Sequence, residues 1–353
     1  MVLTDKSILI TGGTGSLGKV LVRRLLTNEM GQPRKIIVFS RDEAKQHQMR
    51  LAYKLRRAAT DEIIYHNFEE LVEFRIGDVR DYHSVASAVK DADLVFNAAA
   101  LKQVPSCEYF PFEAVQTNIV GPENIIRAIR ENKLPVDTVV GVSTDKACKP
   151  VNVMGMTKAI QERLFLSANL SCRHTRFICV RYGNVLASRG SVIPLFHEQI
   201  SVGGPVTITT EDMTRFLLSL DDAVDVIFAA VREAHRGETY IPHVPSAMVT
   251  DIASVLIGDR DIAVTVIGIR PGEKVHEILI SDEEAQRTVG RGGYYCIRSI
   301  LPEIGVNGAI PPALTGEYSS AGSIMERGRL AAFLQEHRLL VPDSAESADE
   351  LLR

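Results

Sequence analysis

The chain has 353 residues, which is long enough for two domains or for one domain with an added lobe. Its composition, 45% hydrophobic and 24% charged residues, is typical of a globular protein. A net charge of -4 gives no sign of nucleic-acid binding, the N-terminus lacks a secretory pattern, and no apolar run is long enough to span a membrane. Five cysteines lie far apart without metal-ligand spacing, which indicates reduced thiols in a cytoplasmic protein that binds no metal.

Strand and helix patterns alternate through the first half of the chain. Continuous apolar strands that alternate with helices predict a parallel sheet covered on both faces. We therefore expect an α/β fold of the Rossmann type, a doubly wound parallel sheet, over residues 1–182 as a dinucleotide-binding domain. The predicted strands are 7–11, 35–40, 74–79, 92–99, 137–144 and 176–184, and the helical patterns include 17–26, 83–92, 113–132 and 157–169.

After the last of these strands the regular alternation stops. Short strands and Gly-Pro turns predict a smaller α/β substrate lobe, built from residues 183–213 and 241–353. The helical pattern at 221–236 suggests that 214–240 returns to the first domain. The polar, Gly-rich stretch 284–293 is expected to be a mobile loop.

A glycine-rich sequence, TGGTGSLG at 11–18, lies between the first strand and the first helix. Glycine lets the backbone turn tightly and approach a pyrophosphate, whose charge then meets the helix N-terminus. The same residues almost form a nucleotide-triphosphate loop, but Val20 stands where Ser or Thr would bind magnesium. We therefore predict a dinucleotide site. Its candidate residues are Gly12, Thr14, Gly15, Ser16, Leu17 and Gly18.

The second strand ends at Ser40 and Arg41, with Lys45 one turn further on. An NAD site usually has an acid at this point to bind the ribose hydroxyls. A hydroxyl and two cations suit a 2′-phosphate, so we predict NADP, while Asp42 keeps NAD as the alternative.

Two further strand ends add cofactor candidates. Asp78 follows the third predicted strand, where it can accept a hydrogen bond from the adenine amino group, and Val79 stands next to it. Ala98, Ala99 and Ala100 end the next strand, and their small side chains would let the cofactor lie close.

The stretch STDKACKPVNVMGMTK at 143–158 carries the candidate chemistry. It follows an apolar strand and so lies at the carboxyl end of the sheet, where open α/β folds bind ligands. Asp145 and Lys146 offer an acid and a base, or else a local salt bridge. Met154 and Lys158 share one helix face, at the spacing of the Tyr-x-x-x-Lys pair of short-chain dehydrogenases, but with Met in place of Tyr.

Several motifs together resemble one group of extended short-chain dehydrogenases. They are TGGTGSLG, AAALKQVPSCE, STDKACKPVNVMGMTK, RYGNVLASRGSVIPLF, ITTEDMTRF and GIRPGEKVHE, in order over roughly residues 7–280, with EYSS at 317–320 like the group's tail. The group is the inverting UDP-N-acetylglucosamine 4,6-dehydratases. Within it, the chain is most similar to the capsule and O-antigen subgroup that starts N-acetyl-L-fucosamine synthesis, which also carries Met at the tyrosine position.

The resemblance implies a reaction in which NADP oxidises C4 of the sugar, water is lost across C5 and C6, and C5 is inverted. Asp145 would protonate the leaving C6 hydroxyl, and burial would keep it protonated. Lys146 would act as the base, with its pKa lowered by burial, by Lys158 and by the nicotinamide. Thr144 would bind the C4 oxygen, and Lys158 the nicotinamide ribose. Lys146 is also our candidate for taking the C4 hydroxyl proton, since Met154 cannot take one.

The resemblance also implies a substrate clamp for UDP-N-acetylglucosamine. Lys102 and Glu108 border the sugar, and Asn184 binds a phosphate or the sugar. Arg215 and Arg270 bind the diphosphate, because guanidinium can bond phosphate twice. The remaining candidates are Ser191, Val192 and Pro194 along the uracil, and Glu273 at the uridine ribose.

Three alternatives remain from the sequence: a C4 epimerase, a non-inverting dehydratase, and a non-catalytic NADP-binding protein. Met154 argues against an epimerase, whose task is proton transfer at C4. Non-inverting dehydratases usually carry an Asp-Glu pair where this chain has Asp145-Lys146. An intact acid–base pair argues against a non-catalytic protein. The resemblance implies a homo-oligomer, a dimer or a hexamer, formed through helices near 114–131 and 157–169.

Overall fold

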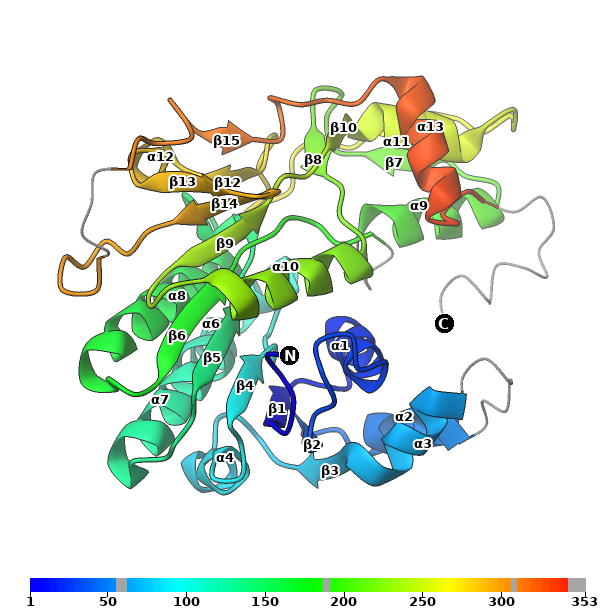
Figure 1. Cartoon of the computed structure of the whole chain (residues 1–353). Coiled ribbons are helices and arrows are strands. Elements are labelled where there is room, and N and C mark those ends of the chain that lie inside the picture. Colours follow the sequence, from blue (N-terminus) through cyan, green and yellow to red (C-terminus); the bar gives the residue numbers. More distant parts are fainter. Residues whose placement is uncertain (55–61, 187–190, 306–309, 342–353) are drawn as a thin grey trace.

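The computed structural model describes residues 1–54, 62–186, 191–305 and 310–341 (Figure 1). A nine-stranded sheet forms its centre, in the order β13-β14-β9-β6-β5-β4-β1-β2-β3. From β3 to β9 the neighbouring strands are parallel, and β14 and β13 add an antiparallel edge. The strands are β1 (Ser7–Thr11), β2 (Lys35–Ser40), β3 (Val72–Ile76), β4 (Leu94–Asn97), β5 (Thr138–Val142), β6 (Arg176–Val180), β9 (Thr239–Pro242), β13 (Thr288–Arg291) and β14 (Tyr294–Ile297).

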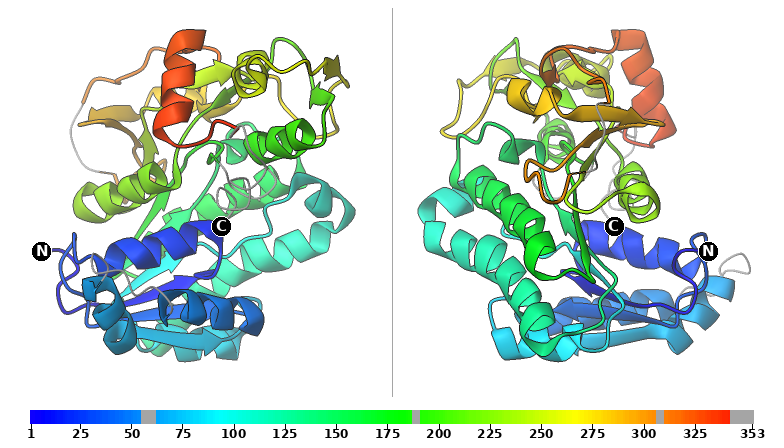
Figure 2. Two further views of the ribbon diagram at one scale, coloured as in Figure 1. Left: turned by 90° about the vertical axis from the view of Figure 1, so that its right-hand side faces the viewer. Right: turned by 60° about the vertical axis from the view of Figure 1, so that its left-hand side comes forward.

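Helices cover both faces of the sheet, which confirms the predicted α/β fold class (Figure 2). Along β1, Ile8 and Ile10 enter one hydrophobic core and Leu9 enters the other, because successive side chains point to opposite faces. Both cores exclude water, so the central strands β1, β4 and β5 are mostly apolar and almost fully buried. The first core is covered by α1 (Ser16–Leu26), α2 (Glu43–Lys54), α3 (Glu62–Leu71) and α10 (Leu220–Glu233), and the second by α4 (Tyr82–Val89), α7 (Gly121–Asn132) and α8 (Val153–Ser171).

A third core, with Phe196, Leu217, Ile252 and Leu330 at its centre, holds a separate lobe together in the upper part of Figure 1. This lobe contains three two-stranded sheets. Its strands are β7 (Val206–Ile208) with β11 (Val264–Val266), β8 (Thr214–Phe216) with β10 (Ser246–Met248), and β12 (Ile278–Ile280) with β15 (Tyr318–Ser319); its helices are α9 (Val192–Ser201), α11 (Val249–Ile257), α12 (Asp282–Ala285) and α13 (Arg327–Glu336).

The structure differs from the expected boundaries in two segments, 284–293 and 214–240. The prediction of a mobile loop at 284–293 was wrong, because Thr288 and Val289 are buried and β13 pairs with β14 at the sheet edge. β13 and β14 form a hairpin, and the pairing of β14 with the distant strand β9 supplies the attachment to the sheet that local sequence does not reveal. Of the segment 214–240, α10 and the first residues of β9 join the first core or its sheet, whereas β8 pairs with β10 in the lobe.

The long helical pattern at 113–132 is divided in the structure. It contains α6 (Pro111–Val115), a π-helical turn at Gln116–Val120 and α7, and it follows α5 (Val104–Tyr109). In the turn, the side chain of Asn118 bonds Leu101 N and O and Thr157 Oγ1, at 2.8 to 3.0 Å. The turn therefore ties the loop after β4 to helix α8. No helix within the described ranges is both long and apolar enough to cross a membrane.

The N-terminus of α8 is fastened to both parts of the molecule. Asn152 caps the helix, since its Oδ1 accepts from Gly155 N at 2.8 Å, and its Nδ2 donates to Gly272 O at 2.7 Å. A Cβ at Gly155 would lie 2.1 Å from the backbone oxygen of Lys146. Glycine is therefore required where α8 packs against the 3₁₀ turn at Asp145–Ala147.

We expect Gly155→Ala to destabilise the fold by about 1–3 kcal/mol and to displace the 3₁₀ turn, because backbone must move to admit the methyl group. Gly328→Ala is the matched control, since nothing lies within 4 Å of that position in α13. Alanine there should leave stability equal or raise it by up to about 1 kcal/mol. Urea unfolding of both variants measures the difference, and equal stability of the two would contradict the expected clash.

Candidate active site

The glycine-rich loop and the end of β4 are in close contact. Gly12 has φ +68°, a left-handed conformation that favours glycine, and a Cβ there would lie 2.8 Å from the Ala99 backbone. A Cβ at Gly18 would lie 2.5 Å from Gly13. Ala99 N donates to Thr11 Oγ1 at 3.3 Å, and Ala98 and Ala100 flank it. The structure thus brings the predicted loop 11–18 and the alanines together.

The residues in this region fit a dinucleotide phosphate. Helix α1 begins after Gly15 with no side-chain cap and no acidic residue in its first turn, so Ser16 and Leu17 open a helix N-terminus that favours an anion. Next to it, Asn97 Nδ2 is buried and has no hydrogen-bond partner among the described residues. An unpaired buried donor is costly unless a ligand accepts from it.

The end of β2 carries the residues expected to select the cofactor. Thr14 Oγ1 donates to the buried Ser40 Oγ at 3.1 Å, which joins the loop to this strand end. Arg41 is exposed and lies 3.6 Å from Asp78, while Lys45 pairs with Asp42 at 2.6 Å.

Asp78 itself is held by Arg80. Burial raises the pKa of Asp78, but Arg80 and Arg41 together bring it below its usual value, so Asp78 is an anion. Its neighbour Val79 is buried, and Val79 O accepts from Asn124 Nδ2 at 2.9 Å. Both predicted cofactor residues therefore have partners within the protein.

The turn after β5 concentrates the candidate catalytic groups. Thr144 is the N-cap of the 3₁₀ turn, and its hydroxyl donates to Asp145 Oδ1 at 2.7 Å. Asp145 is fully buried, and its Oδ2 has no partner among the described residues. A Cβ at Gly183 would come within 3.4 Å of that oxygen, so β6 and its following loop enclose the carboxyl group.

Lys146 lies at the centre of three oxygen acceptors. Its Nζ is 3.2 Å from Asp145 Oδ1, 3.1 Å from Asn184 Oδ1 and 3.1 Å from Glu277 Oε1. The Asp145 and Lys146 side chains face each other, rather than pointing to opposite sides. Lys146 is 20% exposed, which leaves part of its side chain open to a ligand. Arg215 is also buried here, with Nε 3.8 Å from Glu277 Oε1.

Burial and neighbouring charges set the protonation of this cluster. Burial raises the pKa of Asp145, and this outweighs the attraction of Lys146, which is the direction that an acid role would need. Burial also opposes charge on Lys146, but Asp145 and Glu277 outweigh it and raise its pKa. The expected lowering was therefore wrong for this state. Burial raises the pKa of Glu277, and Lys146 and Arg215 reverse that effect, so Glu277 is an anion.

Lys158 lies under the turn after β5. Its Nζ donates to Val142 O at 2.5 Å and to Gln161 Oε1 at 2.6 Å. Burial lowers the pKa of Lys158 to about 8, against smaller opposite effects of Cys179 and Glu162. Met154 is 5% exposed and packs on α5 and α6, in a small apolar cluster with Cys107 and Ala114.

A buried ion cluster lies between this turn and the lobe. Arg181 bonds Glu162 of α8 at 2.6 and 3.0 Å, Glu284 of α12 at 2.7 and 2.9 Å, and Leu279 O of β12 at 2.8 Å. Burial opposes charge on Glu284, but Arg181 lowers its pKa to about 2. Ser143, directly before the catalytic turn, donates to Glu162. Arg181 thus connects the sheet, α8 and β12.

The predicted substrate residues are only partly brought together. Asn184 and Arg215 belong to the Lys146 cluster. Glu108 is exposed and accepts from Val153 N at 2.7 Å at the start of α8, and Lys102 is exposed in the loop before α5. Glu108 thus lies at the start of α8, outside the group of acceptors around Lys146.

The others lie in the lobe. Ser191 is the N-cap of α9, which begins at Val192 and includes Pro194 in its first turn. Arg270 is half exposed and lies 4.0 Å from Glu273, whose other oxygen accepts from Thr209 at 3.3 Å. Motif residues 187–190 lie outside the described residues.

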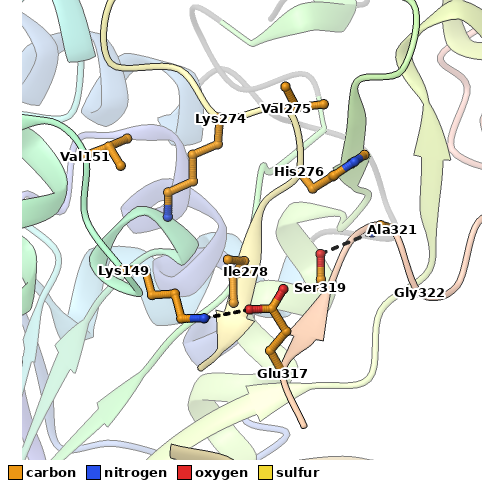
Figure 3. Close-up of a pocket in the computed structure, with 10 residues that line it drawn as sticks. All are labelled: Lys149, Val151, Lys274, Val275, His276, Ile278, Glu317, Ser319, Ala321 and Gly322. Carbon is orange, nitrogen blue, oxygen red and sulfur yellow. Dashed lines mark hydrogen bonds and ion pairs between the residues drawn. The ribbon is translucent and has the colours of Figure 1, made fainter. Parts of the chain in front are cut away.

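An open cavity of about 650 Å³ lies beside the β12–β15 pair (Figure 3). Its walls include Lys149, whose Nζ lies 2.9 Å from Glu317, and Lys274, whose Nζ donates to Cys148 O at 2.6 Å. The predicted catalytic residues do not line it. Burial raises the pKa of Cys148 to about 12, so this thiol is not primed as a nucleophile.

Sequence reasoning missed two of the residues that organise this region, Glu277 and Arg181. Glu277 is the last residue of the motif GIRPGEKVHE, and Arg181 opens RYGNVLASRGSVIPLF. Both motifs indicated segments that lie near the site. Neither Glu277 nor Arg181 could be distinguished within them from an ordinary surface charge. Their burial, at 2% and 3% exposure, is what separates them.

The fold and this arrangement of a glycine-rich loop and catalytic turn define a Rossmann-type α/β protein. The chain belongs to the family described as polysaccharide biosynthesis proteins, whose model matches residues 8–299. A relative named UDP-glucose 4-epimerase, from Rickettsia bellii (strain OSU 85-389), is 45% identical over 298 residues, 83% of each chain. One named UDP-N-acetylglucosamine 4,6-dehydratase (inverting), from Campylobacter jejuni, is 43% identical and covers 83% of this chain and 82% of its own.

Two solved structures are similar to this chain in fold, over different shares of its length. Pen from Bacillus thuringiensis superimposes with a TM-score of 0.83 at 35% identity, over 96% of this chain and 99% of its own. DesIV of Streptomyces venezuelae, a dTDP-glucose 4,6-dehydratase with NAD and TYD bound, has a TM-score of 0.64 at 18% identity, over 76% and 86% of the two chains. The second likeness supports the Rossmann-type fold alone.

We expect Arg181→Met to lower the free energy of unfolding by about 3–5 kcal/mol, because it leaves Glu162 and Glu284 buried without their counter-ion. Arg23→Met is the control. It breaks an ion pair between Arg23 and Asp221, whose side chains are 41% and 56% exposed. This substitution should lower the free energy of unfolding by less than about 1 kcal/mol. Urea unfolding measures both, and a similar small loss in each would contradict the role of the buried cluster.

The stability of the cofactor-free protein should depend on pH through Lys158. Its folded pKa of about 8 lies below the reference value of 10.5, so between them the unfolded chain binds more protons. The contribution of Lys158 to stability therefore rises with pH, by roughly 3 kcal/mol in all. We expect the difference in unfolding free energy, wild type minus Lys158→Met, to increase from pH 7.5 to 10. A difference that stays constant or falls would be the contrary result.

Proposed function

We propose that this protein is an NADP-dependent UDP-N-acetylglucosamine 4,6-dehydratase that also inverts C5, a lyase with 5-epimerase activity. The observation that carries the proposal is the buried group of Thr144, Asp145 and Lys146 at the carboxyl end of β5. It combines a carboxyl group that favours its proton with an amine that is open to a ligand. The relative from Campylobacter jejuni carries the same named activity at 43% identity.

The groups around the turn after β5 divide the proton and binding steps of this reaction. Bound NADP would accept a hydride from C4 of the sugar and return it at C6, and the intervening C4 ketone makes the C5 proton acidic. Thr144 binds the C4 oxygen. Lys146 removes the C5 proton, and Asp145 gives its own proton to the departing C6 hydroxyl. Lys158 binds the nicotinamide ribose, and its low pKa lets it lose a proton near neutral pH.

Lys146 is also our candidate for accepting the C4 hydroxyl proton, which it would pass to solvent water before it removes the C5 proton. Met154 lies in an apolar cluster, and a thioether takes no proton. We infer that Met154 only shapes the site. The chain would then share the Met-for-Tyr feature of the capsule and O-antigen subgroup that begins N-acetyl-L-fucosamine synthesis.

NADP is preferred to NAD because Ser40, Arg41 and Lys45 stand at the end of β2. The guanidinium of Arg41 is exposed, and its one described partner, Asp78, is already held by Arg80. A 2′-phosphate would offer Arg41 a stronger, two-bond partner. NAD stays the alternative, and NAD is the cofactor bound to the DesIV structure.

The UDP-sugar would lie between the two parts of the molecule. We propose Asn184 and Lys102 at the sugar side, with Arg215 and Arg270 at the diphosphate. Glu273 would accept from the uridine ribose. Glu108 borders the sugar from the start of α8, where it already caps a backbone amide. The first turn of α9, with Ser191, Val192 and Pro194, would lie along the uracil.

A homo-oligomer is also part of the proposal. Helix α8 exposes Met156 and Ile160, and Phe110 and Phe112 are exposed next to α5 and α6. Apolar side chains on neighbouring helices favour burial against a second copy.

One second candidate has support of its own. Relatives in Rickettsia are named UDP-glucose 4-epimerase, at up to 45% identity, so C4 epimerisation is the alternative reaction. A C4 epimerase moves a hydride and the hydroxyl proton at C4, and it breaks no bond at C5 or C6. Deuterium at C5 separates the two reactions.

We expect the purified protein, incubated with UDP-N-acetylglucosamine and NADP⁺ in deuterated water, to form a 4-keto-6-deoxy sugar with deuterium at C5 and the L-arabino configuration, read by NMR. Asp145→Asn should lower kcat about 10²–10⁴-fold, because it removes the acid and keeps the shape. UDP-N-acetylgalactosamine as product, without deuterium at C5, would establish the epimerase instead. Replacing NADP⁺ with NAD⁺ in the same assay tests the cofactor.

A further inference from the structure

Glu277 has no role in the reaction described above, yet it lies within its catalytic cluster. It precedes β12, is 2% exposed, and its backbone N donates to Ser320 Oγ at 2.9 Å. Its Oε1 is 3.1 Å from Lys146 Nζ. Its Oε2 is buried without a hydrogen-bond partner among the described residues. A carboxylate so placed can still accept a proton.

Lys146 cannot act as a base while it is an ammonium ion. Its three N–H groups match three acceptors: Asp145 Oδ1, Asn184 Oδ1 and Glu277 Oε1. Before its nitrogen can accept a proton from carbon, one N–H bond must break. In the proposed reaction Asp145 already holds the proton that it gives to the C6 hydroxyl, and an amide oxygen such as that of Asn184 is a very weak base. Glu277 is the one acceptor of the three that is free to take the proton.

We propose that Glu277 takes a proton from Lys146 and thereby produces the neutral amine that acts on the substrate. The Nζ–H bond breaks and an Oε1–H bond forms across 3.1 Å, the nitrogen keeps the electron pair, and both charges disappear. The transfer needs no other reactant. This inference rests on the proposed function, in which Lys146 is the base at C5, and Glu277 acts through Lys146 without touching the sugar.

The surrounding charges explain when the transfer occurs. Asp145 in the 3₁₀ turn and Arg215 of β8 face the Lys146–Glu277 pair, and Lys274 lies on the segment before β12. With Lys146 20% exposed, water and Arg215 favour the ion pair. A sugar that covers Lys146 removes water, which penalises two separate charges more than a neutral amine and acid. Substrate binding therefore prepares the base.

The test is the pH dependence of Glu277→Gln in the full-length enzyme with its cofactor. In the wild type the proton moves inside the site, so the competent state has the same number of protons as the resting state. We expect log kcat/KM to be level across neutral pH. Glutamine accepts a hydrogen bond but no proton, so the variant must lose a proton to water. Its log kcat/KM should rise with unit slope, with kcat reduced about 100-fold at pH 7.

Two further variants exclude a merely structural role. Glu277→Asp keeps a carboxylate and should recover at least about tenfold of the lost kcat and a level profile. Glu317→Gln removes an acid from the same lobe, paired with Lys149, and should keep the wild-type rate and profile. A level profile in Glu277→Gln, or a loss confined to KM, would overturn the proposal.

A measurement without substrate separates this inference from the proposed function. In protein labelled at the lysine side-chain nitrogen, with the signal assigned by Lys146→Met, Glu277→Gln should lower the titration midpoint of Lys146 by about one pH unit or more. An unchanged midpoint would refute the coupling even if the enzyme is active. If UDP-N-acetylglucosamine fails to reduce bound NADP⁺ in the wild type, the substrate assignment fails, and the titration still decides whether Glu277 controls Lys146.

Discussion

The geometry of the site depends on the hydrogen bonds of one buried group, the Arg181 guanidinium. It extends from just beyond β6 and bonds two carboxylates and one carbonyl, from Glu162 in α8, Glu284 in α12 and Leu279 in β12. One planar group with five donors can hold three elements in a fixed relation, which a lysine cannot do. Because Leu279 is two residues from Glu277, this contact also determines where the lobe meets the catalytic turn.

Charge balance explains why such polar groups are tolerated in the interior. Burial penalises each ion, and only paired ions with satisfied hydrogen bonds repay that cost. Around Arg181 the pairing is complete, which makes the cluster a rigid support. Around Lys146 it is incomplete, since one oxygen each of Asp145 and Glu277 has no partner among the described residues. The first cluster positions the second, and the second keeps acceptors available for chemistry.

The sequence predicted correctly those structural features that depend only on residues close together in the chain. The loop 11–18 had to bend sharply between a strand and a helix, and Gly12 and Gly18 indeed lie where a Cβ would strike backbone. The parallel sheet followed from uniformly apolar strands. The stretch 284–293 misled for the opposite reason. Its polar and Gly-rich composition predicts a loop, but Thr288–Arg291 forms a hairpin with β14, and the distant strand β9 holds this hairpin at the sheet edge.

The sequence by itself determined the fold class, the glycine-rich loop between β1 and α1, and the placing of Asp145 and Lys146 at a strand end, because each of these depends on neighbouring residues. Only the tertiary structure decided the protonation of Lys146 and the importance of Glu277 and Arg181. A pKa depends on which charges lie within a few ångströms, and Glu277 comes 131 residues after Lys146 in the chain but lies 3.1 Å from it in space. No local pattern records that distance, since burial and charge pairing are set by how the lobe packs on the sheet.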